Sequence, residues 1–272
     1  MPSELRPMSL GELLDRTFFL YRKHFLLFVG IVALPHLVLL AFQLAGIALQ
    51  LGQTSGFAIA NGLWTLATVV ISLGAVAASQ GATVVAVSHV HLGRPISIAE
   101  SFAGMKGKIL YVALIMIGCW IGIAVGFVLL IIPGIILALM WALTIPVAVL
   151  EDKGLRDSVN RSAELTKGHR GRIFVIYFLF LVLFYAVILA WEIPIFAAVG
   201  IASRGQPITA IPMWSQFAIP LCAFLTQCLV GPLMTIGFSL VYYDERVRKE
   251  AFDLQHMMAS LDSPGATATA PV

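Results

Sequence analysis

Charged residues are scarce in this sequence. Asp, Glu, Lys and Arg make up 11% of its 272 residues, whereas hydrophobic residues make up 60%. A soluble domain carries about 25% charged residues, so this composition excludes an ordinary water-soluble protein. Residues 24–93 and 109–150 contain no charged residue, and residues 173–243 contain only Glu192 and Arg204. The main solvent of the chain is therefore expected to be membrane hydrocarbon.

Cysteine and catalytic motifs are also scarce. The three cysteines, Cys119, Cys222 and Cys228, lie within apolar runs and form no Cys-x-x-Cys or Cys/His spacing, which argues against a disulfide framework or a zinc site. The chain contains no Gly-x-Ser-x-Gly, His-Glu-x-x-His or phosphate-loop motif. We therefore predict a protein that is not an enzyme, that holds no metal or cofactor, and that binds no nucleic acid.

The long uncharged runs predict membrane-spanning helices. A bilayer core about 30 Å thick needs roughly 20 apolar residues per helical span, so each run is long enough for two spans and too long for one. In these runs apolar and polar residues do not alternate strictly, as they would in the strands of a membrane barrel, and this favours helices. We predict an all-α polytopic membrane protein with a single domain over 1–261. Its six transmembrane helices are placed at 25–51, 57–90, 109–132, 135–150, 173–195 and 214–243.

The third and fourth spans must be joined by a very tight turn. Pro133 and Gly134 are the breakers available there, and the turn is therefore expected at these two residues.

Basic residues predict the orientation of the chain. With six spans, the loops alternate between the two sides of the membrane, and of the 17 Lys and Arg residues only Arg204 falls on the side opposite the termini. Basic residues are enriched in cytoplasmic loops. We therefore predict a multi-pass protein of the cytoplasmic (inner) membrane with both termini in the cytoplasm.

Three stretches that precede the first, third and fifth spans share one pattern. They begin at Ser9, Ser97 and Ser158, continue through a mixed helical segment to a basic pair, and then enter a span. Ser9 with Glu12 and Ser97 with Glu100 have the spacing of a capping box, which the third stretch lacks. One interpretation is three repeated units, each an interfacial helix followed by a helical hairpin. The alternative is that any loop before a span has this pattern.

The first of these stretches, at about 9–23, predicts an amphipathic helix suited to the membrane surface. Its apolar face is made of Leu10, Leu13, Leu14, Thr17 and Tyr21. The third stretch instead presents small residues over 158–166, a face better suited to packing against protein.

Two ionisable side chains within the spans are candidate functional residues, because burying such groups in a membrane is costly. His36 follows Pro35 near the middle of the first span, and Glu192 precedes Pro194 near the outer end of the fifth. One hypothesis is a proton or ion site. The other is a neutral, hydrogen-bonded His36 and a Glu192 at the wet interface near Arg204.

A ridge of three glycines marks a second candidate feature. Gly118, Gly122 and Gly126 lie four residues apart on the third span, so they form one face that lets another helix approach closely. The partner helix can belong to the same chain or to another copy.

The end of the chain predicts a continuation of the sixth helix over 244–261, followed by a disordered tail over 262–272. Two pairs at i, i+4 support that helix: Glu245 with Lys249 and Arg246 with Glu250.

Two stretches carry a family resemblance. GLRDSVNRSAELTKGHRGRIF before the fifth span and YYDERVRKEAFDL after the sixth resemble bacterial membrane proteins related to the membrane domain attached to some glycerophosphoryl diester phosphodiesterases, as does the IPG turn. In the full-length members a separate soluble barrel performs hydrolysis. Nothing after Tyr243 is long enough to form such a barrel. The resemblance therefore implies a six-span bacterial membrane domain and transfers no catalytic residue.

Two functional hypotheses remain from the sequence. The first is a membrane scaffold or lipid-associated accessory protein, which the missing catalytic motifs and the interfacial helices favour. Its expected partners are membrane lipids, including anionic headgroups at the cytoplasmic face, and a protein partner or a second copy. The alternative is a small transporter or channel for a solute, lipid or ion that uses His36, Glu192 and proline-broken spans.

Overall fold

The computed structural model describes residues 7–51, 58–202, 212–250 and 258. All regular secondary structure in these residues is helical. The helices, in chain order, are α1 (Leu10–Lys23), α2 (Phe25–Leu51), α3 (Ala58–His91), α4 (Ile98–Ala103), α5 (Ile109–Leu129), α6 (Ile131–Met140), α7 (Thr144–Leu150), α8 (Leu155–Thr166), α9 (Arg170–Ala202) and α10 (Met213–Glu250).

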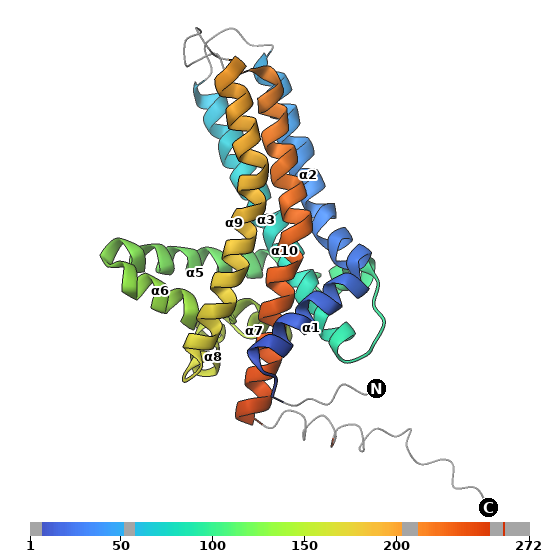
Figure 1. Ribbon diagram of the computed structural model, residues 1–272, viewed down its shortest axis with the longest axis vertical. Helices are drawn as coiled ribbons and strands as arrows, with labels where there is room; N and C mark the ends of the chain where they lie inside the picture. The colour runs from blue at the N-terminus through green and yellow to red at the C-terminus, as the bar shows by residue number, and fades with distance from the viewer. Residues whose placement is uncertain (1–6, 52–57, 203–211, 251–257, 259–272) are drawn as a thin grey trace, which may run out of the picture.

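Four long helices, α2, α3, α9 and α10, run side by side along the longest axis of the molecule (Figure 1). The shorter helices α1, α4, α7 and α8 gather around one end of this bundle, and α10 ends there as well. Six candidate spans are long and apolar enough to cross a membrane, with α6 and α7 together forming one of them. The all-α class and the six apolar segments are confirmed.

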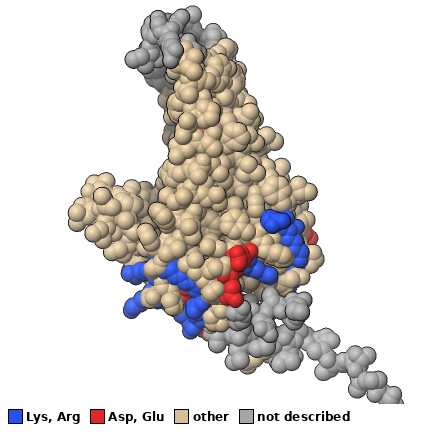
Figure 2. Space-filling model, in the orientation of Figure 1, with Lys and Arg blue, Asp and Glu red and all other residues tan. Residues whose placement is uncertain are grey.

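The charged side chains collect at the end of the bundle that carries the short helices (Figure 2). We call it the charged end. Its basic residues come from α1, from the segments around α4 and α8, and from the last turns of α10. Arg204, the one basic residue expected on the other side, lies outside the described residues.

The core of the bundle lies toward the charged end and is apolar. Phe28 of α2, Ile176 and Phe180 of α9 and Ile236 of α10 are fully buried there. A side chain at Gly237 of α10 would come within 2.4 Å of the Phe180 ring, so this glycine permits the close approach of α9 and α10. Close packing of this kind holds helices together in hydrocarbon, where water exclusion contributes little.

Prolines do not interrupt the long helices. Pro35 lies inside α2, Pro194 inside α9, and Pro220 and Pro232 inside α10, yet each helix continues through them. The expectation of proline-broken spans is therefore wrong. Neighbouring groups can satisfy backbone atoms near a proline, and the Tyr21 hydroxyl donates a 2.8 Å hydrogen bond to a carbonyl of α10 three residues before Pro232.

Helices α5 and α6 form a hairpin that extends sideways from the bundle (Figure 1). The first half of α5 packs against α3 and buries Val112, Ala113, Ile115 and Met116. Beyond Met116, only Gly126 of α5 is buried. We call the part of this hairpin from residue 117 to residue 136 the arm.

The turn of the hairpin differs from the prediction. The chain turns at Leu130, whose backbone is extended, and not at Pro133 and Gly134, which lie in the first turn of α6. A proline is tolerated there because the first N–H groups of a helix have no partner within the helix.

The predicted fourth span, 135–150, is not one continuous helix. It is interrupted at residues 141–143, between α6 and α7. The hydroxyl of Ser162 on α8 bridges the break: it accepts a 3.1 Å hydrogen bond from the Leu143 N–H and donates a 2.7 Å bond to the Met140 carbonyl. The break therefore exposes no unpaired backbone at these two atoms.

The short helices begin as their sequences indicate. Both capping boxes are confirmed, with Ser9 and Glu12 at the start of α1 and Ser97 and Glu100 at the start of α4. Helix α8 begins after Gly154 without a side-chain cap.

The expected lipid-facing side of α1 instead faces protein. Leu13, Thr17 and Tyr21 of that side are buried, mainly against α10. The end of α10 extends far enough to cover this stripe, so α1 exposes Phe18 and Phe19 to the surroundings. The small-residue face of α8 packs against protein as predicted, with Ser158, Ser162 and Thr166 fully buried in the molecule.

The order of elements follows the proposed repeat: α1, α4 and α8 each precede a helical hairpin. The three hairpins are not oriented alike, because α5 and α6 turn aside while the other two lie along the bundle (Figure 1).

Candidate functional site at the charged end

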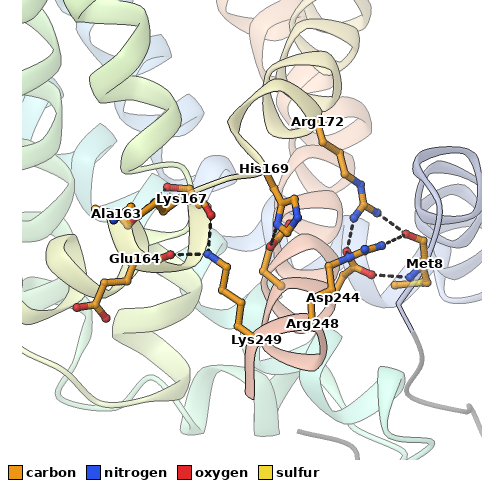
Figure 3. Close-up of polar contacts among 11 residues, drawn as sticks. Met8, Ala163, Glu164, Lys167, His169, Arg172, Asp244, Arg248 and Lys249 are labelled. Carbon is orange, nitrogen blue, oxygen red and sulfur yellow. Dashed lines mark hydrogen bonds and ion pairs between the residues drawn. The ribbon is translucent and has the colours of Figure 1, made fainter. Parts of the chain in front are cut away.

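The buried carboxylate of Asp244, near the end of α10, joins three parts of the chain (Figure 3). Its Oδ2 accepts hydrogen bonds from Arg172 at 2.5 Å and from Arg248 at 2.9 Å, and its Oδ1 accepts one from the Met8 N–H at 2.6 Å. The same two arginines donate to the Met8 carbonyl, at 2.7 and 2.6 Å. Asp244 therefore fixes the entrance to α1 and the start of α9 against α10.

The next residue, Glu245, is also fully buried but faces another neighbour. Its Oε2 accepts a 2.7 Å hydrogen bond from Nδ1 of His169, in the turn before α9. Lys249, one turn later, donates to the carbonyls of Glu164 and Lys167 at 2.6 and 2.7 Å. These carbonyls lie at the C-terminal end of α8, where a cation is favourable.

The same end of α10 contacts the α7–α8 turn through a second network. Tyr242 donates a 3.0 Å hydrogen bond to Glu151, which also pairs with Lys153 at 2.8 Å and lies 3.4 Å from Arg161. Arg161 in turn pairs with Glu250. Burial alone would raise the pKa of Glu151, but the bonds from Lys153 and Tyr242 and the charge of Arg161 outweigh it and hold that pKa below its ordinary value of 4.5.

We call these two networks the charged cluster; it comprises Met8, Glu151, Lys153, Arg161, His169, Arg172, Tyr242, Asp244, Glu245, Arg246, Arg248, Lys249 and Glu250. Asp244, Glu151 and Glu250 each pair with a lysine or arginine of the chain, which is the arrangement of a structural clamp. Glu245 is held by His169 through Oε2, whereas its buried Oε1 has no hydrogen-bond partner among the described residues. In the described ranges, no group of three His, Cys, Asp or Glu side chains could hold a metal ion. The geometry thus serves to fix α1, α8 and α9 to α10.

The sequence anticipated part of the charged cluster. Arg246 and Glu250 pair at 3.1 Å, as predicted. The predicted pair of Glu245 with Lys249 is wrong, because Glu245 lies on the buried side of α10 beside His169 whereas Lys249 points to the end of α8. The rest of the predicted extension and the tail over 262–272 lie outside the described residues, except for the exposed Met258.

Helix α1 presents aromatic and basic side chains on its outer side. Phe19 is 52% exposed, and the side chains of Arg16 and Lys23 lie 5.6 and 5.8 Å from the centre of its ring. A shallow depression beside them is lined by Asp15, Phe18, Phe19, Arg22 and Lys23. We call the half-buried Arg16 and the exposed Phe18, Phe19, Arg22 and Lys23 the α1 surface.

A comparison with protein families decides the class of this protein. The family model described as the membrane domain of glycerophosphoryl diester phosphodiesterase matches residues 111–250, just over half of the chain. The chain belongs to this family. No curated protein and no solved structure matches the chain.

The match to the glycerophosphoryl diester phosphodiesterase membrane domain runs from α5 to the end of α10. It includes every residue of the charged cluster except Met8. The family description names the membrane domain and not the catalytic part of such enzymes. The predicted resemblance is thus confirmed.

Within this membrane domain protein, His36 lies in the interior of α2. Its Nδ1 lies 2.9 Å from the Val32 carbonyl one turn earlier, and its buried Nε2 has no hydrogen-bond partner among the described residues. The structure places it in a different part of the molecule from the charged cluster, because α2 meets that end only at its first residues.

Glu192 lines a groove between α9 and α10. The groove has a volume of about 140 Å³; apolar side chains such as Phe184 and Ile219 form much of its lining, and Thr226 and Gln227 add polar groups. No hydrogen bond or ion pair joins Glu192 to another residue within the described ranges. Arg204, its predicted neighbour, lies outside those ranges.

The three glycines of α5 face neighbours in the same chain. A side chain at Gly126 would lie 3.0 Å from the Gly134 backbone of α6, and one at Gly122 would lie 2.4 Å from the Trp141 ring. At Gly118 the nearest atom would be 3.4 Å away, on Leu155 of α8, which is an ordinary contact. Gly122 and Gly126 therefore line the seam between α5 and α6.

Proposed function

We propose that this chain is a non-catalytic membrane scaffold that holds the α1 surface against anionic lipid headgroups at the cytoplasmic face of a bacterial inner membrane. The α1 surface carries the proposal. It places two exposed phenylalanines among three cations, directly before α2 enters the apolar bundle. Aromatic rings favour the membrane interface, and each basic residue near an anionic surface contributes about 1 kcal/mol of attraction.

The charged cluster supports this role by making α1 rigid. Met8, just before α1, is bound through both its N–H and its carbonyl, and the opposite side of α1 packs on α10. A surface that is already ordered loses little conformational freedom when it binds. Asp244, Glu151 and Glu250 of the charged cluster are paired with lysines and arginines of the same chain, which suits a structural role.

Native mass spectrometry from nanodiscs tests the proposal. Nanodiscs of mixed phosphatidylcholine and phosphatidylglycerol are used, and the phosphatidylglycerol retained by the released protein is measured. The double variant Arg22→Gln/Lys23→Gln should retain less than the unmodified protein. The matched control, Arg94→Gln/Lys106→Gln, removes two exposed cations from the same end outside α1. Equal losses in both variants would show a general charge effect and would reject the α1 surface as the lipid site.

A transporter is the second candidate, and the Glu192 groove favours it. A carboxylate that has no partner among the described residues and lies in a largely apolar groove is the kind of group that binds a proton or cation within a membrane. Proton and potassium flux into proteoliposomes would distinguish the two functions. A flux above that of empty liposomes that is lost in Glu192→Gln would support the transporter and contradict the scaffold. Equal flux for the unmodified protein, for Glu192→Gln and for empty liposomes would support the scaffold.

A further inference from the structure

The arm is the largest feature that the proposed function leaves unexplained. It leaves the bundle sideways, while α2, α3, α9 and α10 follow the long axis (Figure 1). Both of its ends connect at the charged end, through α4 before α5 and through α7 and α8 after α6. Helix α5 has 21 residues and is long enough to cross a membrane, but it does not run in the direction of the four helices that do.

The surface of the arm is apolar on all sides. No charged residue occurs from 109 to 150, and none appears on the arm in the space-filling view (Figure 2). Trp120 is 73% exposed, Val128 is 87% exposed and Ile132 is 70% exposed. An apolar surface of this extent is not stable in water, so it requires a hydrophobic environment.

The backbone at the turn of the arm is partly paired within the hairpin, although α6 begins without a side-chain cap. In lipid, each backbone N–H and carbonyl needs a partner within the protein. At the turn, the Leu130 N–H bonds to the Gly126 carbonyl at 3.1 Å, and the Leu130 carbonyl accepts from the Gly134 N–H at 3.3 Å. The change of direction at Leu130 therefore occurs without leaving these groups unpaired.

We propose that the arm lies within one leaflet of the membrane, along its plane and next to the charged end, and that it does not cross the bilayer. The long axis of the four-helix bundle defines the membrane normal, since its helices have 27 to 38 residues and span about 40 Å or more. A hairpin directed sideways from this axis then lies parallel to the bilayer. The arm is then surrounded by the lipid acyl chains of the leaflet at the charged end, because it carries no charge and adjoins that end.

This placement is independent of which side the charged end faces. A hairpin returns to the side from which it started, whether or not it crosses. The segments around α4 and α8 therefore remain on one side in both cases. The count of basic residues cannot distinguish a crossing hairpin from one lying in a leaflet, and the two differ only in the depth of the middle and the tip of the arm.

A depth profile by spin labelling distinguishes them. The native cysteines Cys119, Cys222 and Cys228 are replaced by alanine, and single nitroxide labels are placed in lipid nanodiscs on two sets of exposed positions. The α5 set is Leu110, Ile121 and Val128, and the matched control on the crossing helix α2 is Leu26, Leu37 and Leu49. Depth is obtained from the relative relaxation by oxygen and by a water-soluble nickel chelate.

The control should give a shallow, deep and shallow series along α2. If the arm lies in one leaflet, all three α5 positions should be shallow, with Ile121 close in depth to Leu26. A value for Ile121 as deep as that for Leu37 would overturn the proposal, and so would free access of the nickel chelate to Val128. Spin–spin broadening at Val128 that persists on dilution with lipid would also overturn it, because the arm would then pack on a second copy. Failure of the lipid-retention experiment would leave this profile unaffected.

Discussion

The N–H of Met8 donates a 2.6 Å hydrogen bond to the carboxylate of Asp244, which lies 236 residues later in the sequence. This bond joins the segment before α1 to the end of α10. Arg172 and Arg248 complete the arrangement by donating both to Asp244 and to the Met8 carbonyl. The four groups share these hydrogen bonds, so the loss of Asp244 removes the counter-charge of both arginines and the partner of the Met8 N–H.

Replacing Asp244 by Asn should destabilise the protein strongly. The variant leaves two partly buried arginines without their counter-charge, and breaking a buried pair in this way costs about 3–5 kcal/mol. The measurement is thermal unfolding in detergent. Asp152→Asn is the matched control, because this carboxylate pairs with Lys108 but is 73% exposed, where a pair contributes less than about 1 kcal/mol. Equal unfolding temperatures for the two variants would show that the Asp244 arrangement is not a clamp.

Replacing Ser162 by Ala should weaken the contact between α8 and the break that separates α6 from α7. The Leu143 N–H and the Met140 carbonyl would both lose their bonds to the hydroxyl, at an expected cost of about 1–3 kcal/mol. Ser72→Ala is a suitable control, since the Ser72 hydroxyl donates to the Val69 carbonyl of its own helix and bridges no second element among the described residues. A melting temperature of Ser162→Ala no lower than that of the control would contradict the bridging role.

Replacing Gly126 by Ala should separate α5 from α6. The new methyl group would lie 3.0 Å from the Gly134 backbone, which cannot move as a side chain can, and such overpacking costs about 1–3 kcal/mol. Gly118→Ala makes only an ordinary contact with Leu155 and should leave stability unchanged or slightly higher. Thermal unfolding of both variants checks this, and the reverse order would place the packing seam elsewhere.

Stability should fall in acid through Glu151. The pKa of Glu151 is lower in the folded protein than its ordinary 4.5, so its contribution is complete above about pH 5 and is lost as the pH falls through the folded pKa. Unfolding temperatures measured from pH 6 downward, a range of about two units, should decline less steeply for Glu151→Gln than for the unmodified protein. Parallel curves would show that Glu151 has no part in the acid sensitivity.

The sequence predicts the long elements well because hydrocarbon imposes a simple rule. Any run of about 20 apolar residues must form a helix to satisfy its backbone. The capping boxes at Ser9 and Ser97 were equally readable, because all of their groups lie within one turn. The break at 141–143 was not predictable, since its stabilising hydroxyl comes from Ser162, on another helix.

Most contacts of the charged cluster could not be predicted from the sequence for a related reason. Rules for i, i+4 pairs describe neighbours on one helix, and they correctly indicated Arg246 with Glu250. They assigned Glu245 to Lys249 because the sequence does not reveal which side of α10 is covered by the turn at His169. The direction of the arm is likewise a tertiary property, because Leu130 and its neighbours have the same apolar composition in a crossing hairpin and in one that lies along the membrane.

Orientation in intact cells tests the central claim most directly, because lipid binding at the cytoplasmic face requires the charged end to lie inside. In the cysteine-free protein, a single cysteine is placed at exposed Arg156, beside the start of α8, or at exposed Ile59, at the opposite end of the bundle. A membrane-impermeant maleimide is added to whole cells and to inverted vesicles. The account predicts that position 156 reacts only in inverted vesicles and that any reaction at position 59 occurs in whole cells. Labelling of position 156 in whole cells would contradict it.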